Sequence, residues 1–212
     1  MQPSKIKLSL AIGALCFGAS GASMADTFDL TVNTINDVTI TEVTALNFGE
    51  NITTDANGVC AMDADTPPAA TMLTDTIAVF DGTTYGVITG TSCIGSGVTV
   101  ATPGVYSIAG EAGLTVNITV QDEVQAAGDF TFNPAGGVAV SYVDGATNDT
   151  AEALLLNTAV PVRLADATGG PEVGGAVDGR TRFTVGGTIT TGPTGLSSDT
   201  DYVATFNVNV IY

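Results

Sequence analysis

The chain has 212 residues, of which 22 are acidic, five are Lys or Arg and none is His, so its formal net charge is −17. Nucleic-acid binding is strongly disfavoured, and so is attachment to an anionic lipid surface, because both need clustered basic side chains. Hydrophobic residues make up 44% of the chain, which is enough for one domain with a sizeable core.

The first 25 residues have the features of an export signal. A positive start at Lys5 and Lys7 precedes the apolar stretch Leu8–Phe17, and small residues then lead to a cleavage site that we place after Ala25. The apolar stretch is too short for a stable anchor, and no later stretch reaches membrane-spanning length. We therefore predict a signal peptide (residues 1–25) and one exported domain (residues 26–212) that does not span a membrane.

The exported chain is predicted to begin with a β-strand. Apolar residues alternate with polar ones there, with Phe28, Leu30 and Val32 on one face and Asp29, Thr31 and Asn33 on the other. A side-chain period of two indicates a strand that places one face in a core.

Short runs rich in Val, Ile, Thr and Phe then recur between turn residues, which is typical of an antiparallel sandwich or barrel. We predict strands at Phe28–Thr34, Val38–Thr41, Ala45–Phe48, Thr76–Phe80, Thr84–Thr89, Val98–Ala101, Gly104–Ala109, Leu114–Val120, Asp129–Asn133, Val138–Val143, Ala159–Leu164, Arg182–Thr190 and Tyr202–Ile211. A short helical turn is predicted at Glu152–Asn157, and long loops at Thr53–Asp75 and Asp166–Arg180.

Two cysteines, Cys60 and Cys93, remain after removal of the signal peptide. An isolated pair in an exported protein usually forms a disulfide. A redox or metal-binding role is the weaker alternative, because the chain has no Cys-x-x-Cys spacing and no histidine.

The chain ends in the clearest strand pattern of all. One face carries Tyr202, Ala204, Phe206, Val208, Val210 and Tyr212, and the other carries Val203, Thr205, Asn207, Asn209 and Ile211. We predict that the first set faces a core. Strands at both ends of an exported chain can be exchanged between copies, which favours a fibre subunit over an enzyme.

Catalysis and cofactor binding have little support. The absence of His removes the usual general base and zinc ligand, and we predict no enzyme activity, no cofactor and no metal site. Acidic pairs occur at Asp63/Asp65, Asp122/Glu123 and Asp199/Asp201. Neither Asp63/Asp65 nor Asp199/Asp201 matches the spacing of a calcium loop, so turn formation explains them better than Ca²⁺ binding does.

Three segments resemble a known family. Ala45-Leu46-Asn47-Phe48-Gly49, Arg182–Thr188 and Asp201–Tyr212 occur in the order and placement of the bacterial secreted family called domain of unknown function 4402. That family is itself similar to spore coat U and archaic chaperone–usher pilin domains. The resemblance implies an immunoglobulin-like antiparallel β-sandwich (pilin-like), export to the periplasm or cell surface, and assembly into fibres.

In pilins of that kind, the N-terminal strand of one subunit completes the next subunit. By position, Phe28, Leu30 and Val32 would form this donor strand, and the Tyr202–Tyr212 strand would flank the acceptor site. The expected partners are further copies of the chain, a periplasmic chaperone and an outer-membrane usher.

Three hypotheses follow. The first is a structural subunit of a cell-surface fibre, pilus or surface matrix that assembles by N-terminal strand donation. The second is a self-complete extracellular binding or adhesion module that uses the acidic loops at Thr53–Asp75 and Asp166–Arg180. The third is another kind of periplasmic or outer-membrane-associated protein.

Overall fold

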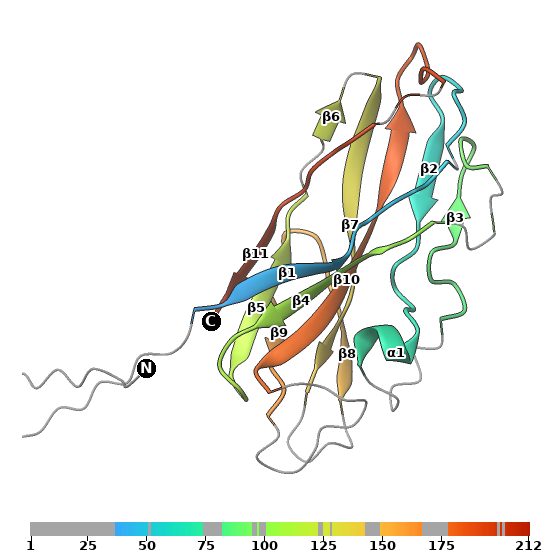
Figure 1. Ribbon diagram of the computed structural model, residues 1–212. Helices are drawn as coiled ribbons and strands as arrows, with labels where there is room; N and C mark the ends of the chain where they lie inside the picture. The colour runs from blue at the N-terminus through green and yellow to red at the C-terminus, as the bar shows by residue number, and fades with distance from the viewer. Residues whose placement is uncertain are drawn as a thin grey trace, which may run out of the picture. The chain divides into compact units, whose positions relative to one another are not determined.

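The computed structural model describes residues 37–50, 52–73, 82–94, 97, 101–122, 125–127, 129–142, 149–166, 178–198, 200 and 202–212. This part of the chain is all-β with antiparallel sheets, as predicted (Figure 1). The helix described in it, α1 (Ala69–Met72), has only four residues. No helix among these residues is long and apolar enough to cross a membrane.

The strands are β1 (Thr39–Thr44), β2 (Val59–Met62), β3 (Ile88–Thr89), β4 (Gly104–Ala109), β5 (Thr115–Val120), β6 (Gln125–Ala127), β7 (Phe130–Ser141), β8 (Thr150–Ala153), β9 (Val160–Arg163), β10 (Arg180–Thr191) and β11 (Val208–Ile211). β10 is the centre of an eight-stranded sheet. One edge of β10 pairs with β4 through its first half and with β2 through its second half, and its other edge pairs with β7. β1 extends this sheet beside β4, β3 extends it beside β2, and both β6 and β8 pair with β7.

A three-stranded sheet, in the order β11-β5-β9, lies against one face of the larger sheet. Its strands are antiparallel, with Val210 opposite Ile118 and Ile118 opposite Val160. The alternation of apolar and polar residues in β5 places Val116, Ile118 and Val120 on one face, and all three are fully buried. The arrangement is sandwich-like, because two antiparallel sheets share one apolar interior.

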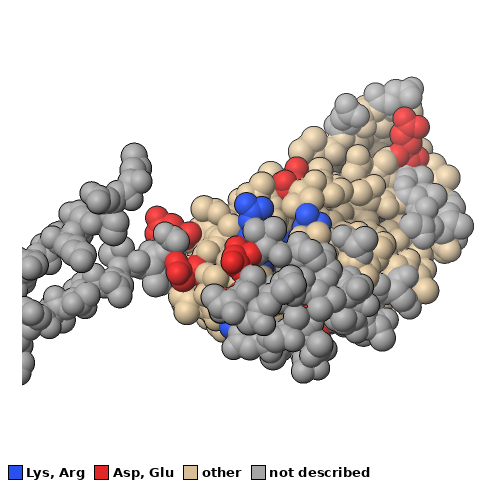
Figure 2. Space-filling view, turned by 60° about the horizontal axis from the view of Figure 1, so that its bottom comes forward, with Lys and Arg blue, Asp and Glu red and all other residues tan. Residues whose placement is uncertain are grey.

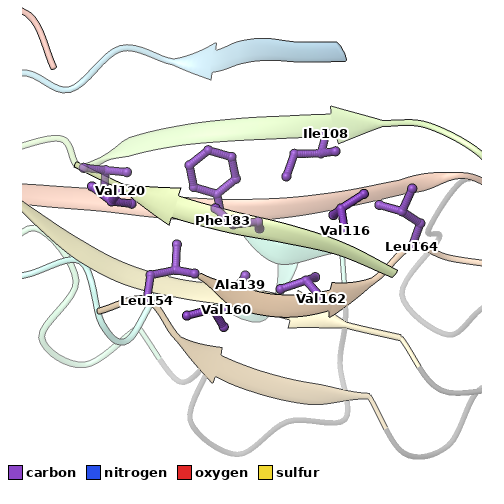
Figure 3. Close-up of a cluster of buried hydrophobic side chains, with 11 residues drawn as sticks. Ile108, Val116, Val120, Ala139, Leu154, Val160, Val162, Leu164 and Phe183 are labelled. Atoms are coloured by element: carbon purple, nitrogen blue, oxygen red, sulfur yellow. The ribbon is translucent and has the colours of Figure 1, made fainter. Parts of the chain in front are cut away.

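The main core lies between the two sheets. Figure 3 shows Ile108 from β4 and Phe183 from β10 on one side, with β5 and β9 side chains opposite them. The buried members of this core are Ile108, Val116, Ile118, Val120, Ala139, Leu154, Val160, Val162, Leu164, Phe183 and Val185. Burial of each large aliphatic or aromatic side chain stabilises the fold by about 1.5–3 kcal/mol.

A second core covers the other end of the larger sheet. It consists of Phe48, Cys60, Met62, Ile88, Cys93, Phe130 and Phe132. Cys60 and Cys93 form the predicted disulfide, with their Cα atoms 5.1 Å apart. A third, smaller cluster contains Met72 of α1 together with Val138, Val140, Tyr142 and Ala165.

A buried threonine fills an irregularity between β7 and β10. The register shifts between Phe183 and Val185, which leaves backbone groups near Thr184 without strand partners. The Thr184 hydroxyl accepts a hydrogen bond from the Val138 N–H (3.0 Å) and donates one to the Ala64 carbonyl (2.8 Å). Thr184 is fully buried, so these bonds satisfy polar groups that water cannot reach.

We expect Thr184→Val to lower the free energy of unfolding by about 2–4 kcal/mol, because a near-isosteric side chain would leave two buried backbone groups unpaired. The matched control is Thr188→Val in the same strand, because the Thr188 hydroxyl makes no hydrogen bond within the described residues. Urea unfolding of both variants measures the difference. A Thr184→Val variant within about 0.5 kcal/mol of the control would contradict this role.

Several predicted elements differ in the structure. The loop predicted over Thr53–Asp75 is wrong at Val59–Met62, which form β2, and at Ala69–Met72, which form α1. The helical turn predicted at Glu152–Asn157 is also wrong at its start, because β8 runs to Ala153 and pairs with β7. Ala, Glu and Leu favour a helix there, and strand pairing overrides that weak preference.

Two predicted strands, Asp129–Asn133 and Val138–Val143, are joined in the structure as β7. Pro134 is tolerated because it lies between the parts of β7 that pair with β6 and with β8. Gly136 is needed two residues later, since a Cβ there would clash with the Leu154 carbonyl oxygen.

One predicted strand does not pair as a strand in the structure, and other predicted elements lie outside the described residues. Ala45–Phe48 makes a single bridge, between Asn47 and Thr102, in place of a strand. The predicted strands Phe28–Thr34 and Thr76–Phe80, most of Val98–Ala101, and most of the predicted loop Asp166–Arg180 lie outside the described residues.

Candidate functional site

The C-terminal segment Tyr202–Tyr212 is paired along only part of its length. β11 pairs with β5, and the Asn207 carbonyl accepts a hydrogen bond from the Gln121 N–H (3.0 Å). In the described part of the chain, no backbone hydrogen bond joins Tyr202–Phe206 to another strand. The strand predicted over Tyr202–Ile211 is therefore a ladder only over Val208–Ile211.

The outer edge of this segment is open. Antiparallel strands direct the backbone groups of alternate residues toward the partner strand. Because Asn207 bonds toward β5, Asn209 and Ile211 do so as well, and the N–H and C=O groups of Val208 and Val210 point away from β5. β11 has no second strand partner among the residues described.

Side chains hold the unpaired half of the segment in place. The Tyr202 ring packs edge-on against Phe130, with 5.4 Å between the ring centroids. The ring centroid of Phe206 lies 6.2 Å from that of Phe132 and 5.9 Å from that of Tyr106. The Tyr202 hydroxyl also accepts a hydrogen bond from the Ser197 N–H (2.8 Å). At the other end, the Tyr212 hydroxyl accepts one from the Glu111 N–H (2.6 Å).

These contacts bury the even-numbered side chains only in part. Tyr202, Ala204, Phe206, Val208, Val210 and Tyr212 are all half-buried and pack against one core or the other. Their odd-numbered neighbours are exposed, and Val203 is 76% exposed. The even-numbered side chains, which the sequence pattern assigns to a core, therefore face the core but are not fully buried.

β1 lies at the same margin of the molecule as β11 (Figure 1). It pairs only with β4 in the part of the chain that the structure covers, and Ile40 lies opposite the fully buried Ile108. Directly paired residues share one face of a sheet, so Ile40 is on the core side, yet it is 41% exposed. Val38 and Leu46, which flank β1, are also only half-buried against the core.

We call this margin the open edge. It is defined by partly exposed, core-facing side chains on both sheets, namely Val38, Ile40, Leu46, Tyr106, Phe206, Val208, Val210 and Tyr212.

The opposite margin of the two sheets is closed. There the Tyr142 N–H donates to the Arg163 carbonyl (3.1 Å), and the Arg163 N–H donates to the Ser141 hydroxyl (3.1 Å). Val162 of β9 and Leu164 after it are fully buried. Most of the partly buried side chains that pack against the main core therefore lie at the open edge, with Leu156 outside it.

Tyr106 is the ionisable side chain of β4 at the open edge. Its ring stacks on Phe183 (5.3 Å) and meets Phe206 edge-on. Burial first, and the charge of Glu42 second, raise the pKa of Tyr106 to about 12.

We expect Tyr106→Phe to reduce the loss of stability at high pH. Above the ordinary tyrosine pKa of 10.0, the unfolded chain ionises Tyr106 while the folded chain keeps it protonated. Stability therefore falls as pH rises from about 10 to about 12, and phenylalanine removes that contribution. Unfolding free energies at about pH 8 and about pH 11 measure the effect. Equal alkaline losses in wild type and variant would contradict it.

The Asp63/Asp65 pair forms a turn in the structure. The Asp63 carboxylate accepts a hydrogen bond from the Asp65 N–H (2.8 Å), which is a turn contact. Desolvation first, and Asp63 second, raise the pKa of Asp65. Within the described ranges, no group of three or more Cys, Asp or Glu side chains could hold a metal ion. Figure 2 shows the acidic side chains of the drawn face in small separate groups.

The predicted donor residues Phe28, Leu30 and Val32 lie outside the described residues, as do Glu123, Asp199 and Asp201. Sequence reasoning missed the contributions of Ile40 and Tyr106 to the open edge. The alternation of Val38 and Ile40 with polar residues was the available signal for β1. Nothing in the sequence shows that β1 and the C-terminal segment lie close together.

No protein-family model, no curated protein and no solved structure matches this chain. What the protein does is therefore inferred from its own sequence and from the open edge.

Proposed function

We propose that the protein is an exported structural subunit of a cell-surface fibre, and that its open edge accepts the N-terminal strand of a neighbouring copy. The observation that carries this proposal is the partial exposure of core-facing side chains on both β1 and the C-terminal segment. With a strand in place, the domain would be an immunoglobulin-like sandwich of the kind that the family resemblance implies.

An extended strand suits this edge better than a compact ligand. The outward N–H and C=O groups of Val208 and Val210 offer a ladder to a new strand. Alternate side chains of that strand would cover Ile40, Tyr106 and Phe206. A filled edge would also remove the aggregation hazard of an exposed strand.

The segment Phe28–Asn33 has the matching pattern. Phe28, Leu30 and Val32 lie on one face of the predicted strand, and each would contribute about 1.5–3 kcal/mol if fully buried. A neighbour's segment gives a head-to-tail contact that does not close on itself, and such contacts build filaments. A tight turn at Asn36-Asp37 would instead fold the segment back onto its own β1, which makes a self-complete domain.

Assembly of this kind needs export and protection of the open edge beforehand. The signal peptide predicted at residues 1–25 is the sequence feature that supports export. A periplasmic chaperone that lends a temporary strand and an outer-membrane usher that orders the subunits are the partners we propose.

The test is electrophoresis of material sheared from the cell surface, in SDS with and without boiling. Strand-exchanged polymers unfold slowly, so we expect a ladder in the unboiled lane and a single monomer band after boiling. A monomer band in both lanes would overturn polymerisation by strand exchange and favour the self-complete domain.

A further inference from the structure

Glu42 is a carboxylate on the core-facing side of the open edge. It lies opposite Tyr106 in the β1–β4 pairing, beside the register shift between Glu42 and Thr44. Paired residues share one face of a sheet, and the Tyr106 ring lies on the core side, stacked on Phe183. Glu42 therefore points to the same side as Ile40, where every other residue of the open edge is apolar or aromatic.

The carboxylate is exposed and has no hydrogen bond or ion pair with the residues that the structure describes. From β4 the titratable group that faces it is Tyr106, since Gly104–Ala109 contains no other ionisable side chain. Among the side chains of the C-terminal segment Tyr202–Tyr212, the ionisable groups are the tyrosine hydroxyls at its two ends. Asp37 and Glu111 lie beyond the Thr39–Ala109 end of the β1–β4 pair. No positive charge from these elements offsets Glu42.

The proposed occupant brings no positive side chain either. Residues 26–36 contain no Lys or Arg, and the face meant for the core carries Phe28, Leu30 and Val32. A strand that pairs with β11 and covers the core-facing side of β1 would also cover Glu42 with apolar groups. Burial of an unpaired carboxylate is costly, and such a group takes up a proton instead.

Building on the proposed function, we propose that Glu42 controls occupation of the open edge. The N-terminal strand of a second copy binds there together with uptake of one proton by Glu42. A strand that carries an acidic side chain on its inward face is rejected. Because the covered carboxyl holds its proton to higher pH than the open one, occupation is favoured at low pH. It weakens by up to about tenfold for each unit of pH rise until the carboxyl of the filled edge also ionises.

The test compares polymerisation of the full exported chain, its Glu42→Gln variant and its Glu50→Gln variant. Glu50 is an exposed acid in the turn after Phe48, so its replacement removes the same charge away from the open edge. The readout is the amount of unboiled SDS-resistant ladder formed in a fixed time between about pH 5 and about pH 8. Circular dichroism at each pH checks that the chains are folded.

We expect wild type and Glu50→Gln to polymerise at least about tenfold less at the high end of this range. Glu42→Gln should polymerise at all pH values as wild type does at the low end. A Glu42→Gln variant that keeps the wild-type pH dependence would overturn the role of Glu42, and so would a wild-type ladder that is independent of pH. Absence of any ladder from all three chains at every pH would overturn the proposed function and this inference with it.

Discussion

Replacement of both Cys60 and Cys93 by alanine is expected to lower the free energy of unfolding by about 3.5–4 kcal/mol. The disulfide closes a loop with a sequence separation of 33, and its loss returns that chain entropy to the unfolded state. Both cysteines are buried in the second core, against which Tyr202, Ala204 and Phe206 pack. Loosening this core would also loosen the unpaired half of the C-terminal segment.

Ser92→Ala is the control for the cysteine exchange. Ser92 precedes Cys93 and is fully buried, and within the described region its hydroxyl has no hydrogen-bond partner. Its removal should leave stability unchanged or slightly higher. Urea unfolding of the double cysteine variant, beside Ser92→Ala, measures the contribution. A double variant within about 1 kcal/mol of wild type would mean that the disulfide adds little to stability.

The variant Leu30→Asp is expected to abolish SDS-resistant polymers while leaving the monomer folded. Leu30 is the middle residue of the predicted donor face, and an aspartate there would place an unpaired carboxylate in the filled edge, close to the core. The ladder in unboiled SDS should disappear, and circular dichroism should retain the β-sheet signal.

Thr31→Asp is the matched control, because it introduces the same charge on the outward face of the same strand. It should polymerise as wild type does. Equal loss of polymers in both variants would show that charge alone, and not the inward face, is responsible. Loss of the fold in Leu30→Asp would indicate that the segment completes its own domain.

The periodicity of two was a good guide where strands have partners on both sides or a buried face. Gly104–Ala109 was predicted with the bounds that β4 has, and β5, β9 and β10 were predicted within a few residues. The all-β, antiparallel architecture and the Cys60–Cys93 disulfide were also predicted from the sequence and are confirmed.

The errors have physical causes. β2 is short and lies among turn residues, so Cys60 and Met62 are the only buried pair that marks it. β8 was misread because Ala, Glu and Leu favour helices, while its pairing with β7 depends on contacts distant in sequence. The C-terminal strand is shorter than its pattern because a ladder needs a partner, and β5 supplies one only as far as Val120.

Only the C-terminal part of the open edge could be predicted from the sequence. The alternation over Tyr202–Tyr212 predicts a core-facing side, and Val208 and Val210 do face the core. Sequence periodicity does not encode the pairing of β1 with β4. That pairing places Glu42 and Tyr106 beside the C-terminal segment, whose core-facing side is only half-buried.

Amide hydrogen exchange of the C-terminal segment tests the central claim most directly. The comparison is between wild-type polymer and the full-length Leu30→Asp chain, read at the N–H groups of Val208 and Val210. We predict that these amides exchange at least about a hundredfold more slowly in the polymer, because the donated strand accepts their hydrogen bonds. Equal exchange rates in the two samples, or amides already protected in the Leu30→Asp monomer, would contradict an edge that is open in the monomer and filled by a neighbour.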